Sequence, residues 1–351
     1  MNRSVKGIAM IAGAMVAAGI LFTGIGFLLG GNQPIYLDSK GIHVGDREGG
    51  NSGDDRLVSF SHDVESFSNI SVDLDYYDVD LVPGDRFAVK GAYLSREGEP
   101  VIKVENDTLK IEDGRHAGVN VSIDLPGLIT YKNQPNITIY YPETTKLKHV
   151  VIDCDSSDLA FENLTAEQAE FDLEFGRLEL SGITANNITV EMSSGECSLK
   201  GIKAAEKLDV SNEFGKISLE NAETKNLELE ADSGDVTLTD TTFDTGDLTL
   251  DLGKLTARDI VSNGMKVKSS KGEVNVAGKL TGVTDITSDM GKVTVNPGAS
   301  KDQFKYELNA DMGSVTVGGE KMSGNTVAAN TSAANTLKIK AGMGEIRVDF
   351  E

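Results

Sequence analysis

The 351-residue sequence contains no tryptophan, only two cysteines and only four histidines. Aromatic residues make up 6% of the chain, so a carbohydrate site built from stacked rings would depend on few tyrosines. The histidines are scattered and lack the spacing of zinc ligands. Cys154 and Cys197 replace apolar residues in different columns of a repeating pattern, which predicts two buried thiols and no disulfide. We therefore expect neither a metal nor a cofactor.

Positive charge is also scarce. The chain has 33 Lys and Arg residues against 55 Asp and Glu residues, a net charge of −22 and a pI near 4.6. Nucleic-acid binding needs a basic face, and docking onto an anionic bilayer needs basic clusters, so the composition argues against both for the soluble part. An acidic surface permits binding of cations or cationic peptides, although it also serves solubility.

Motifs of common hydrolases and nucleotide-binding enzymes are missing: there is no GxSxG, no Walker loop and no HExxH. Carboxylates are plentiful, and polysaccharide-cleaving enzymes use them in pairs. The two candidate clusters are Asp73, Asp75, Asp78 and Asp80, and Asp153, Asp155 and Asp158. Their acids take outward or turn positions of expected strands, which is typical of a solvated face. The sequence therefore predicts a protein that is not an enzyme.

A short phrase recurs through the second half of the chain. It reads EADSGDVTL at residues 230–238, and related phrases stand at 191–199, 211–219, 287–295 and 309–317. The glycines of the pattern are Gly176, Gly195, Gly215, Gly234, Gly253, Gly272, Gly291, Gly313 and Gly344. They follow one another after 19 or 20 residues, and the last two after 22 and 31. So short and strict a period indicates a solenoid.

Apolar and polar residues alternate around each glycine, as at Ile217 and Leu219 after Gly215. A period of two is typical of strands with one buried face, and no repeat shows the 3.6-residue period of a helix. We therefore predict an all-β fold, a single-chain parallel β-solenoid (β-helix) of ~19-residue coils, each with about two short strands. The regular coils occupy residues 150–351. The last coil, Gly344–Glu351, is expected to be exposed and able to stack on another molecule.

The charge of the residue after the glycine alternates in sign through seven successive repeats. In chain order these residues are Arg177, Glu196, Lys216, Asp235, Lys254, Glu273, Lys292, Ser314 and Glu345. In a parallel stack they would be direct neighbours, where opposite charges are mildly stabilising and like charges are not. The alternation therefore favours a single register of the coils.

The longest apolar run, IAMIAGAMVAAGILFTGIGFLL at residues 8–29, has 22 residues without a charge and is long enough to span a bilayer. Arg3 and Lys6 precede it. We therefore predict that residues 1–30 form a cytoplasmic stub and one N-terminal transmembrane helix, a signal anchor of a single-pass cell-membrane protein with an extracytoplasmic remainder. A cleaved signal peptide is the alternative, but it would have a shorter apolar region and a small-x-small site. The polar residues 31–56 are expected to form a flexible linker.

The period is broken between the linker and the regular coils. Residues 57–149 are expected to form degenerate coils or a cap with a long loop at Asp124–Pro135. Insertions in solenoids often bind partners, so Tyr131, Tyr140 and Tyr141 are the candidate ligand contacts. The alternative is that this region only caps the first coils.

Several segments carry a resemblance. They are NISVDLDYYDVDLVPGD at residues 69–85, TLKIED at 108–113 and the serial units SSGECSL, DSGDVTL and DMGKVTV. Together they resemble the putative-adhesin family, a domain of unknown function with serial β-strand repeats, found mainly in Gram-positive bacteria, and the resemblance covers residues 57–351. It implies an extracytoplasmic protein, held by one amino-terminal span, with a role in envelope sensing or adhesion. The family supplies no functional residues to carry over.

These features predict a non-enzymatic, membrane-anchored, extracytoplasmic β-solenoid protein that binds or senses a cell-envelope component or a membrane protein partner. A surface adhesin for external ligands is the first alternative, but about a dozen coils extend only some 50–60 Å, which is short for crossing a thick wall. A polysaccharide-active β-helix enzyme is the second alternative, and it would need a cleft with paired acids beside the Asp124–Pro135 loop.

Overall fold

The computed structural model describes residues 35–38, 41–44, 56–114, 134–322, 326–329 and 332–351. The chain forms two compact units, and the first consists of residues 1–55 and 115–132. Its described part is an antiparallel hairpin of β1 (Ile35–Asp38) and β2 (Gly41–Val44), which lies within the predicted linker. The predicted membrane segment falls outside the described residues. Within them, no helix has the length and apolar character needed to span a bilayer.

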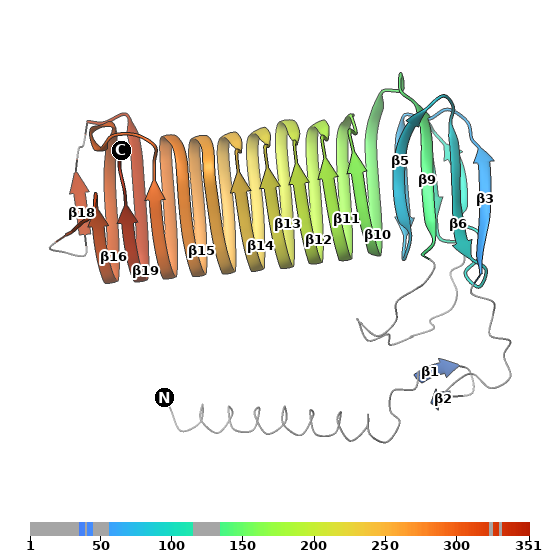
Figure 1. Ribbon diagram of the computed structural model, residues 1–351, viewed down its shortest axis with the longest axis horizontal. Coiled ribbons are helices and arrows are strands. Elements are labelled where there is room, and N and C mark those ends of the chain that lie inside the picture. Colours follow the sequence, from blue (N-terminus) through green and yellow to red (C-terminus); the bar gives the residue numbers. More distant parts are fainter. Residues whose placement is uncertain (1–34, 39–40, 45–55, 115–133, 323–325, 330–331) are drawn as a thin grey trace. The chain divides into compact units, whose positions relative to one another are not determined.

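The second unit, residues 56–114 and 133–351, consists almost wholly of strands. Its central strands are β10 (Leu147–Glu162), β11 (Ala166–Ser181), β12 (Thr184–Lys200), β13 (Lys203–Glu220), β14 (Glu223–Thr239) and β15 (Thr242–Asn296). Each pairs in parallel with the next, which confirms the all-β solenoid (Figure 1). β15 runs unbroken through the coils of Gly253, Gly272 and Gly291. The expected two short strands per coil are therefore one continuous strand that bends at the glycine.

Glycine is required at this bend because the neighbouring coil leaves no room for a side chain. Gly234 has a φ of 155°, and a Cβ atom there would lie 1.5 Å from the carbonyl oxygen of Gly215 in the adjacent coil. A second bend uses residues that tolerate a left-handed backbone, such as Asn221 with a φ of 53° and Asp240 with a φ of 49°. Bends at fixed positions give successive coils the same shape.

The core is a stack of inward-pointing apolar columns enclosed by the coils. Leu178, Cys197 and Ile217 form part of one column, and each is at most 1% exposed. Cys154 belongs to another column, where it pairs with Leu173. Both cysteines are buried and free, as the sequence predicts. Burial raises the pKa of both thiols to about 12, which keeps them protonated and unreactive at neutral pH.

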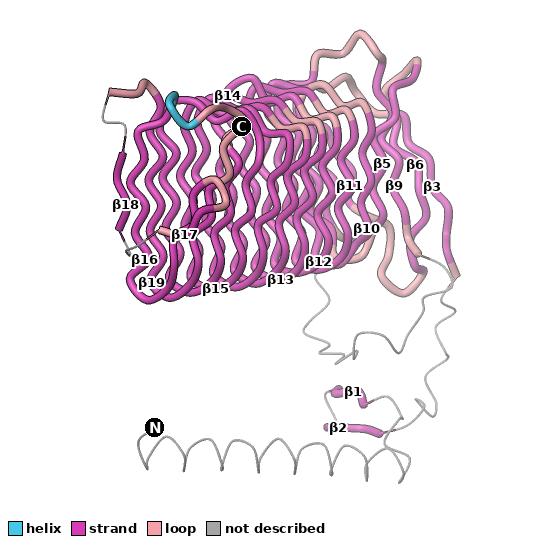
Figure 2. Tube along the Cα trace, turned by 60° about the vertical axis from the view of Figure 1, so that its left-hand side comes forward, coloured by secondary structure: helices cyan, strands magenta, loops and turns pink. Residues whose placement is uncertain are grey.

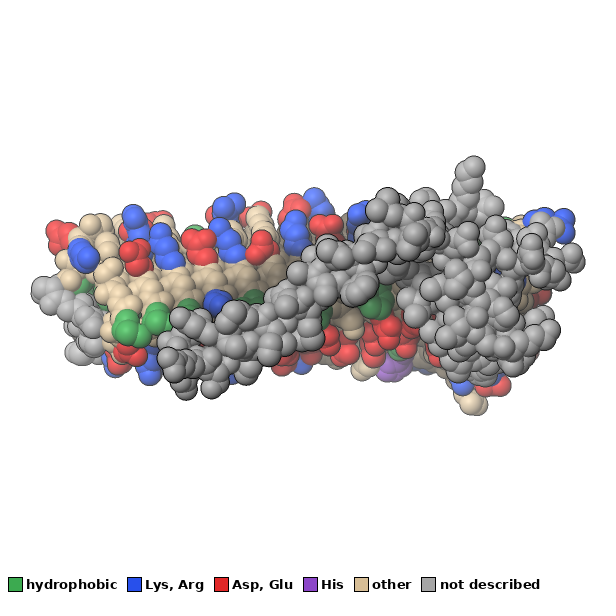
Figure 3. Space-filling view, turned by 90° about the horizontal axis from the view of Figure 1, so that it is seen from below, with side chains coloured by type: hydrophobic (Ala, Val, Ile, Leu, Met, Phe, Trp, Pro, Cys, Tyr) green, Lys and Arg blue, Asp and Glu red, His purple; other side chains and the backbone are tan. Residues whose placement is uncertain are grey.

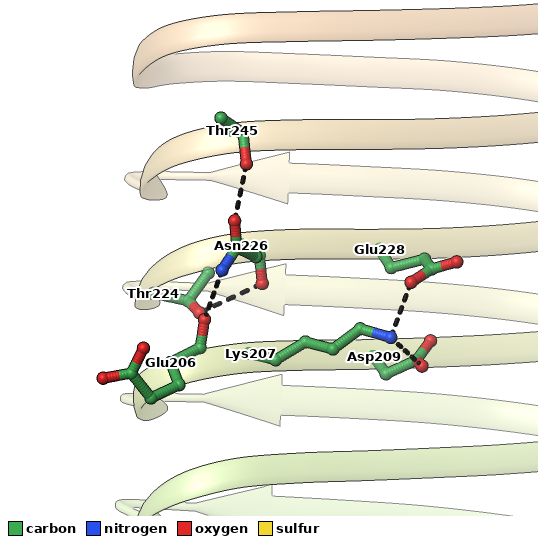
Figure 4. Close-up of polar contacts among 7 residues, drawn as sticks. All are labelled: Glu206, Lys207, Asp209, Thr224, Asn226, Glu228 and Thr245. Carbon is green, nitrogen blue, oxygen red and sulfur yellow. Dashed lines mark hydrogen bonds and ion pairs between the residues drawn. The ribbon is translucent and has the colours of Figure 1, made fainter.

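The single 20-residue step is absorbed by a β-bulge in β13. The register between β12 and β13 shifts after Ala204, because β13 carries one extra residue before Lys207. In the next coil, Nδ2 of Asn226 donates to the carbonyl oxygen of Glu206 within the bulge, at 2.9 Å. The hydroxyl of Thr245 donates in turn to Oδ1 of Asn226, at 2.7 Å (Figure 4). These hydrogen bonds satisfy polar groups at the bulge, where the regular ladder of backbone hydrogen bonds between coils is interrupted.

At the amino-terminal end, the coil pattern gives way to shorter strands. They are β3 (Leu57–Asp63), β4 (Asn69–Leu74), β5 (Asp78–Gly84), β6 (Ala88–Leu94), β7 (Val101–Glu105), β8 (Thr108–Glu112) and β9 (Asn136–Pro142). β4 pairs in parallel with β10 and with β8, which forms a hairpin with β7. A separate four-stranded sheet has the order β3-β6-β9-β5. Buried residues of both groups join the core of the solenoid, whose strands are drawn in Figure 2.

At the carboxyl-terminal end, the spatial order of the coils departs from the chain order. The elements are the 3-10 turn η1 (Lys301–Gln303), β16 (Phe304–Val317), β17 (Glu320–Lys321), β18 (Thr326–Ala329) and β19 (Asn335–Val348). β19 is inserted between β15 and β16, with Gly344 facing both Gly291 and Gly313. The expectation of an exposed last coil is therefore wrong. The outermost coil is β16, which pairs antiparallel with β17 and β18 (Figure 1).

Candidate functional surface

The bend at the repeat glycine is an exposed part of several coils, although residues 193–195 of β12 are half-buried. In β13, residues 213–216 are all exposed, whereas Asn212 before them and Ile217 after them are buried. Side chains beside the glycine therefore project from one edge of the solenoid, and parallel pairing stacks them about 4.8 Å apart. We call the residues two before, one before and one after the glycine the acid column, the edge column and the charge column.

The charge column confirms the alternation of sign and extends it. In spatial order its members are Asp158, Arg177, Glu196, Lys216, Asp235, Lys254, Glu273, Lys292, Glu345 and Ser314. Because β19 is inserted, Glu345 lies beside Lys292 and continues the alternation. Nζ of Lys254 lies 3.0 Å from the carboxylate of Glu273. Exposed pairs of this kind contribute little stability, so the column chiefly favours one register, and its charges nearly cancel.

The edge column holds several of the largest exposed apolar side chains among the described residues. Phe175 is 55%, Phe214 58%, Leu252 50% and Met312 66% exposed. In spatial order the members are Tyr76, Ser156, Phe175, Ser194, Phe214, Ser233, Leu252, Lys271, Met290, Met343 and Met312. Up to Leu252, a large side chain alternates with a serine. Figure 3 shows hydrophobic side chains beside a tan strip, with blue and red side chains alternating on its other side.

The acid column is almost uniformly negative over the first coils. Its members there are Asp75, Asp155, Glu174, Ser193, Glu213, Asp232 and Asp251. A second acid column lies four residues before the glycine, at Asp73, Asp153, Asp172, Glu191, Ser211 and Glu230. These two columns form the acidic face. It joins Asp73 and Asp75 of the first predicted cluster to Asp153 and Asp155 of the second, whereas Asp158 belongs to the charge column.

Like charges crowd one another at the amino-terminal end of the acidic face. Burial, together with the carboxylates of Asp75 and Glu174, raises the pKa of Asp155 to about 6. Burial and like charges also raise the pKa of Asp153. Asp113 accepts a hydrogen bond from the backbone N–H of Asp75 at 2.8 Å, and burial raises the pKa of its carboxyl to about 6. A cationic ligand on this face would relieve the repulsion.

The acidic face is hollowed into a shallow depression over β10, β11, β12 and β13. Among the residues that the structure describes, no group of three or more His, Cys, Asp or Glu side chains has the arrangement of a metal site. The carboxylates follow columns and do not converge on one point. This arrangement suits an extended ligand with several cationic groups better than a single ion.

Of the predicted contact tyrosines, Tyr131 lies outside the described residues. Tyr140 and Tyr141 are consecutive on β9 and therefore point to opposite faces of its sheet. Tyr140 is half-buried, and Nζ of Lys90 lies 5.1 Å from the centroid of its ring. Tyr141 is only 6% exposed, and burial raises the pKa of its hydroxyl. The two rings thus share no surface, and a ligand contact at Tyr140 stays a prediction.

The stacked coils and their columns define a parallel β-solenoid with a periodic, exposed edge. The chain belongs to the family described as Toastrack DUF4097, whose model matches residues 67–349. This match confirms the resemblance to a domain of unknown function with repeated strands. No curated protein sequence matches the chain.

Several solved structures are similar to the chain. One from Parabacteroides merdae, described as a "putative adhesin", is 12% identical, with 85% of this chain and 98% of that chain covered and a TM-score of 0.39. One from Parabacteroides distasonis, described as a "putative lipid binding protein", is 13% identical, with 84% and 98% covered and a TM-score of 0.38. A "putative cell adhesion protein" from Clostridium sporogenes is 13% identical, with 84% and 100% covered and a TM-score of 0.20. At these scores the likenesses support no inference about function.

Proposed function

We propose that this protein is a non-enzymatic, membrane-anchored, extracytoplasmic binding protein. Its solenoid binds or senses a cell-envelope component or a membrane protein partner. The observation that carries the proposal is the edge of the solenoid, where the acid, edge and charge columns run side by side over successive coils. Such an edge offers repeated contacts to an extended partner, whereas catalysis needs a few groups that converge on one reacting atom.

The anchoring part of the proposal rests on sequence. Residues 8–29 carry no charge, and Arg3 and Lys6 precede them, which favours an amino end in the cytoplasm. The regular coils from β10 to β16 would extend about 50 Å at 4.8 Å per coil. A solenoid of that length is short for crossing a thick wall, which favours an envelope partner over an external adhesin ligand.

The topology can be tested with single cysteines, because the two native thiols are buried and unreactive. Lys321 on β17 is exposed, and Lys321→Cys is expected to react with a membrane-impermeant maleimide in intact cells. Asn2→Cys is expected to react only after the membrane is permeabilised. Labelling of residue 2 but not of residue 321 in intact cells would contradict the proposed orientation.

The binding role can be tested by cross-linking the full-length protein in intact cells and identifying the products by mass spectrometry. A specific membrane protein or envelope polymer among the products is the expected result. Turnover of a wall polymer by the purified protein would overturn the non-enzymatic assignment. Loss of that turnover in an Asp155→Asn variant would then point to the acidic face as a catalytic site.

A further inference from the structure

Large apolar side chains recur at every second coil of the edge column between β11 and β15. Phe175, Phe214 and Leu252 are at least half exposed, and Ser194 and Ser233 separate them. Single exposed apolar side chains are ordinary, but a regular row of them along one edge marks an interaction surface. Because serine is small, the row consists of projections with gaps between them.

The two flanks of this row differ in charge. On one flank the charge column alternates in sign, so its charges nearly cancel. On the other flank lie Glu174, Glu213, Asp232 and Asp251 of the acid column, all of them exposed. The complementary partner is therefore apolar along its centre and cationic along one side.

The spacing of the row fits an α-helix that lies along the axis of the solenoid. Two coils advance about 9.6 Å, at 4.8 Å per coil. Seven residues of an α-helix advance about 10.5 Å, at 1.5 Å per residue. A helix with one apolar face would therefore place side chains into the gaps at Ser194 and Ser233 with little mismatch. In an extended strand, residues on one face recur about every 6.8 Å, which falls out of step with the row.

We propose that the edge from Phe175 to Leu252 binds a cationic amphipathic helix of another polypeptide. Apolar residues of the helix pack around Phe175, Phe214 and Leu252, and its Lys or Arg side chains pair with the acid column. The inference rests on the proposed function and deepens it, because it names the class of partner that the edge takes. A second copy of this chain fits poorly, since its net charge of −22 repels the acid column. An anionic bilayer is repelled for the same reason.

The test uses full-length protein in nanodiscs of zwitterionic lipid, with empty nanodiscs as the reference. The probe is a labelled 18-residue peptide of Leu and Lys whose leucines fall on one helical face, and binding is followed by fluorescence anisotropy. A peptide of the same composition with its leucines dispersed is the matched probe. The amphipathic peptide is expected to bind at least tenfold more tightly than the dispersed one, and less tightly as salt rises.

Two sets of substitutions locate the binding. The edge variant F175S/F214S/L252S replaces the three large apolar residues with serine, the residue that already separates them in the column. It is expected to bind the amphipathic peptide at least tenfold more weakly. The acid variant E213Q/D232N/D251N is expected to bind about tenfold more weakly, with a smaller dependence on salt. The control variant E167Q/E223Q/D244N removes the same charge from exposed positions away from the glycine bends and is expected to stay within twofold of the wild type.

Several results would overturn the proposal, provided that thermal melts show folded variants. They are equal binding of the dispersed peptide, wild-type affinity of the edge variant, and a loss of affinity as large in the control variant as in the acid variant. A further contradicting result would be an edge variant that still binds the amphipathic peptide with wild-type affinity. Such a variant would instead have lost self-association in sedimentation, or binding to zwitterionic vesicles. The proposed function would survive each of these results, because the topology and the in-cell partner are measured without the peptide.

Discussion

The middle and the carboxyl-terminal end of the solenoid are built from the same repeat, but their coils differ in whether the spatial order matches the order in the sequence. From β10 to β15, each coil stacks on its predecessor in sequence, whereas β19 passes over β16 and pairs with β15. The columns match in both regions, since a Cβ atom at Gly344 would lie 1.6 Å from the carbonyl oxygen of Gly291, and Glu345 pairs with Lys292. Complementary columns therefore select the neighbours of a coil, and chain order follows only where the connections are short.

The largest effect is expected in the middle, from Gly234→Ala. Its Cβ atom would lie 1.5 Å from the carbonyl oxygen of Gly215, so the backbone of two coils must shift. We expect a loss of about 4 kcal/mol or more in the free energy of unfolding, or failure to fold. Gly318→Ala near the end is the control, because it has a φ of 57° with no atom within 4 Å, and we expect it to cost about 1 kcal/mol. Equal denaturant midpoints for the two variants would contradict the packing of the glycine column.

The next effect compares buried isoleucines of the two regions. Ile339 in β19 and Ile217 in β13 are 0 and 1% exposed, and each has a paired coil on both sides. Truncation of either to alanine is expected to lower the free energy of unfolding by about 2–5 kcal/mol. Urea denaturation gives both values. If Ile339→Ala costs less than half as much as Ile217→Ala, β19 is not an inserted coil.

Engineered cysteine pairs provide an independent reading of the coil order. Thr294 faces Arg347 in the inserted coil, and Thr316 lies one coil further on. Neighbouring coils about 4.8 Å apart suit a disulfide, whereas a distance of two coils does not. T294C/R347C is expected to cross-link under mild oxidation and T294C/T316C is not. The reverse result would show that the last coils stack in the order of the sequence, with β16 beside β15.

A smaller effect is expected at the bulge, which is the irregular point of the otherwise regular middle. Asn226→Ala removes the donor to the carbonyl oxygen of Glu206 and the acceptor of the Thr245 hydroxyl. We expect it to lower the free energy of unfolding by about 1 kcal/mol. Asn187 holds the same column position in β12, on the opposite side of the bulged coil, and makes neither of these two hydrogen bonds. Asn187→Ala is expected to change stability by less than about 0.5 kcal/mol, and an equal loss in both would show that the bulge contacts are not stabilising.

The smallest effect concerns pH and the crowded end of the acidic face. The pKa values of Asp155 and Asp113 are about 6 in the folded protein, against about 3.9 in an unfolded chain. Between these values the folded state binds more protons, so the stability these groups contribute is present below about pH 4 and is lost as pH rises through 6. We expect Tm to rise by roughly 1–3 °C from pH 7.5 to pH 5. Asp155→Asn should raise Tm at pH 7.5 and reduce this shift, and a Tm that falls towards pH 5 in both proteins would contradict the assignment.

The sequence was sufficient for the middle of the molecule because one residue at each column position carries a clear physical demand. Gly234 has no room for a side chain, Ile217 needs burial, and Lys216 needs neighbours of opposite charge, so a 19-residue spacing predicts the coil and its register.

The insertion of β19 could not be predicted, because steps of 22 and 31 residues fit either order of the last two coils. The edge column was not predicted from the sequence, because Phe214 and Ser233 differ in size and polarity although both precede the repeat glycine. The proximity of Asp75 to Asp155 could not be predicted, because it depends on the pairing of β4 with β10, which lie far apart in sequence.

If the edge column is the surface that contacts the partner, a cross-linker placed on it will capture that partner. The photo-reactive amino acid p-benzoyl-phenylalanine is placed at position 214 in the edge column and, separately, at position 223 on another part of the coil. After illumination of intact cells, position 214 is predicted to give one discrete polypeptide adduct with a basic, amphipathic segment, and position 223 is predicted to give none. Absence of an adduct at 214, or the same adduct from both positions, would show that the edge column is not the partner's binding surface.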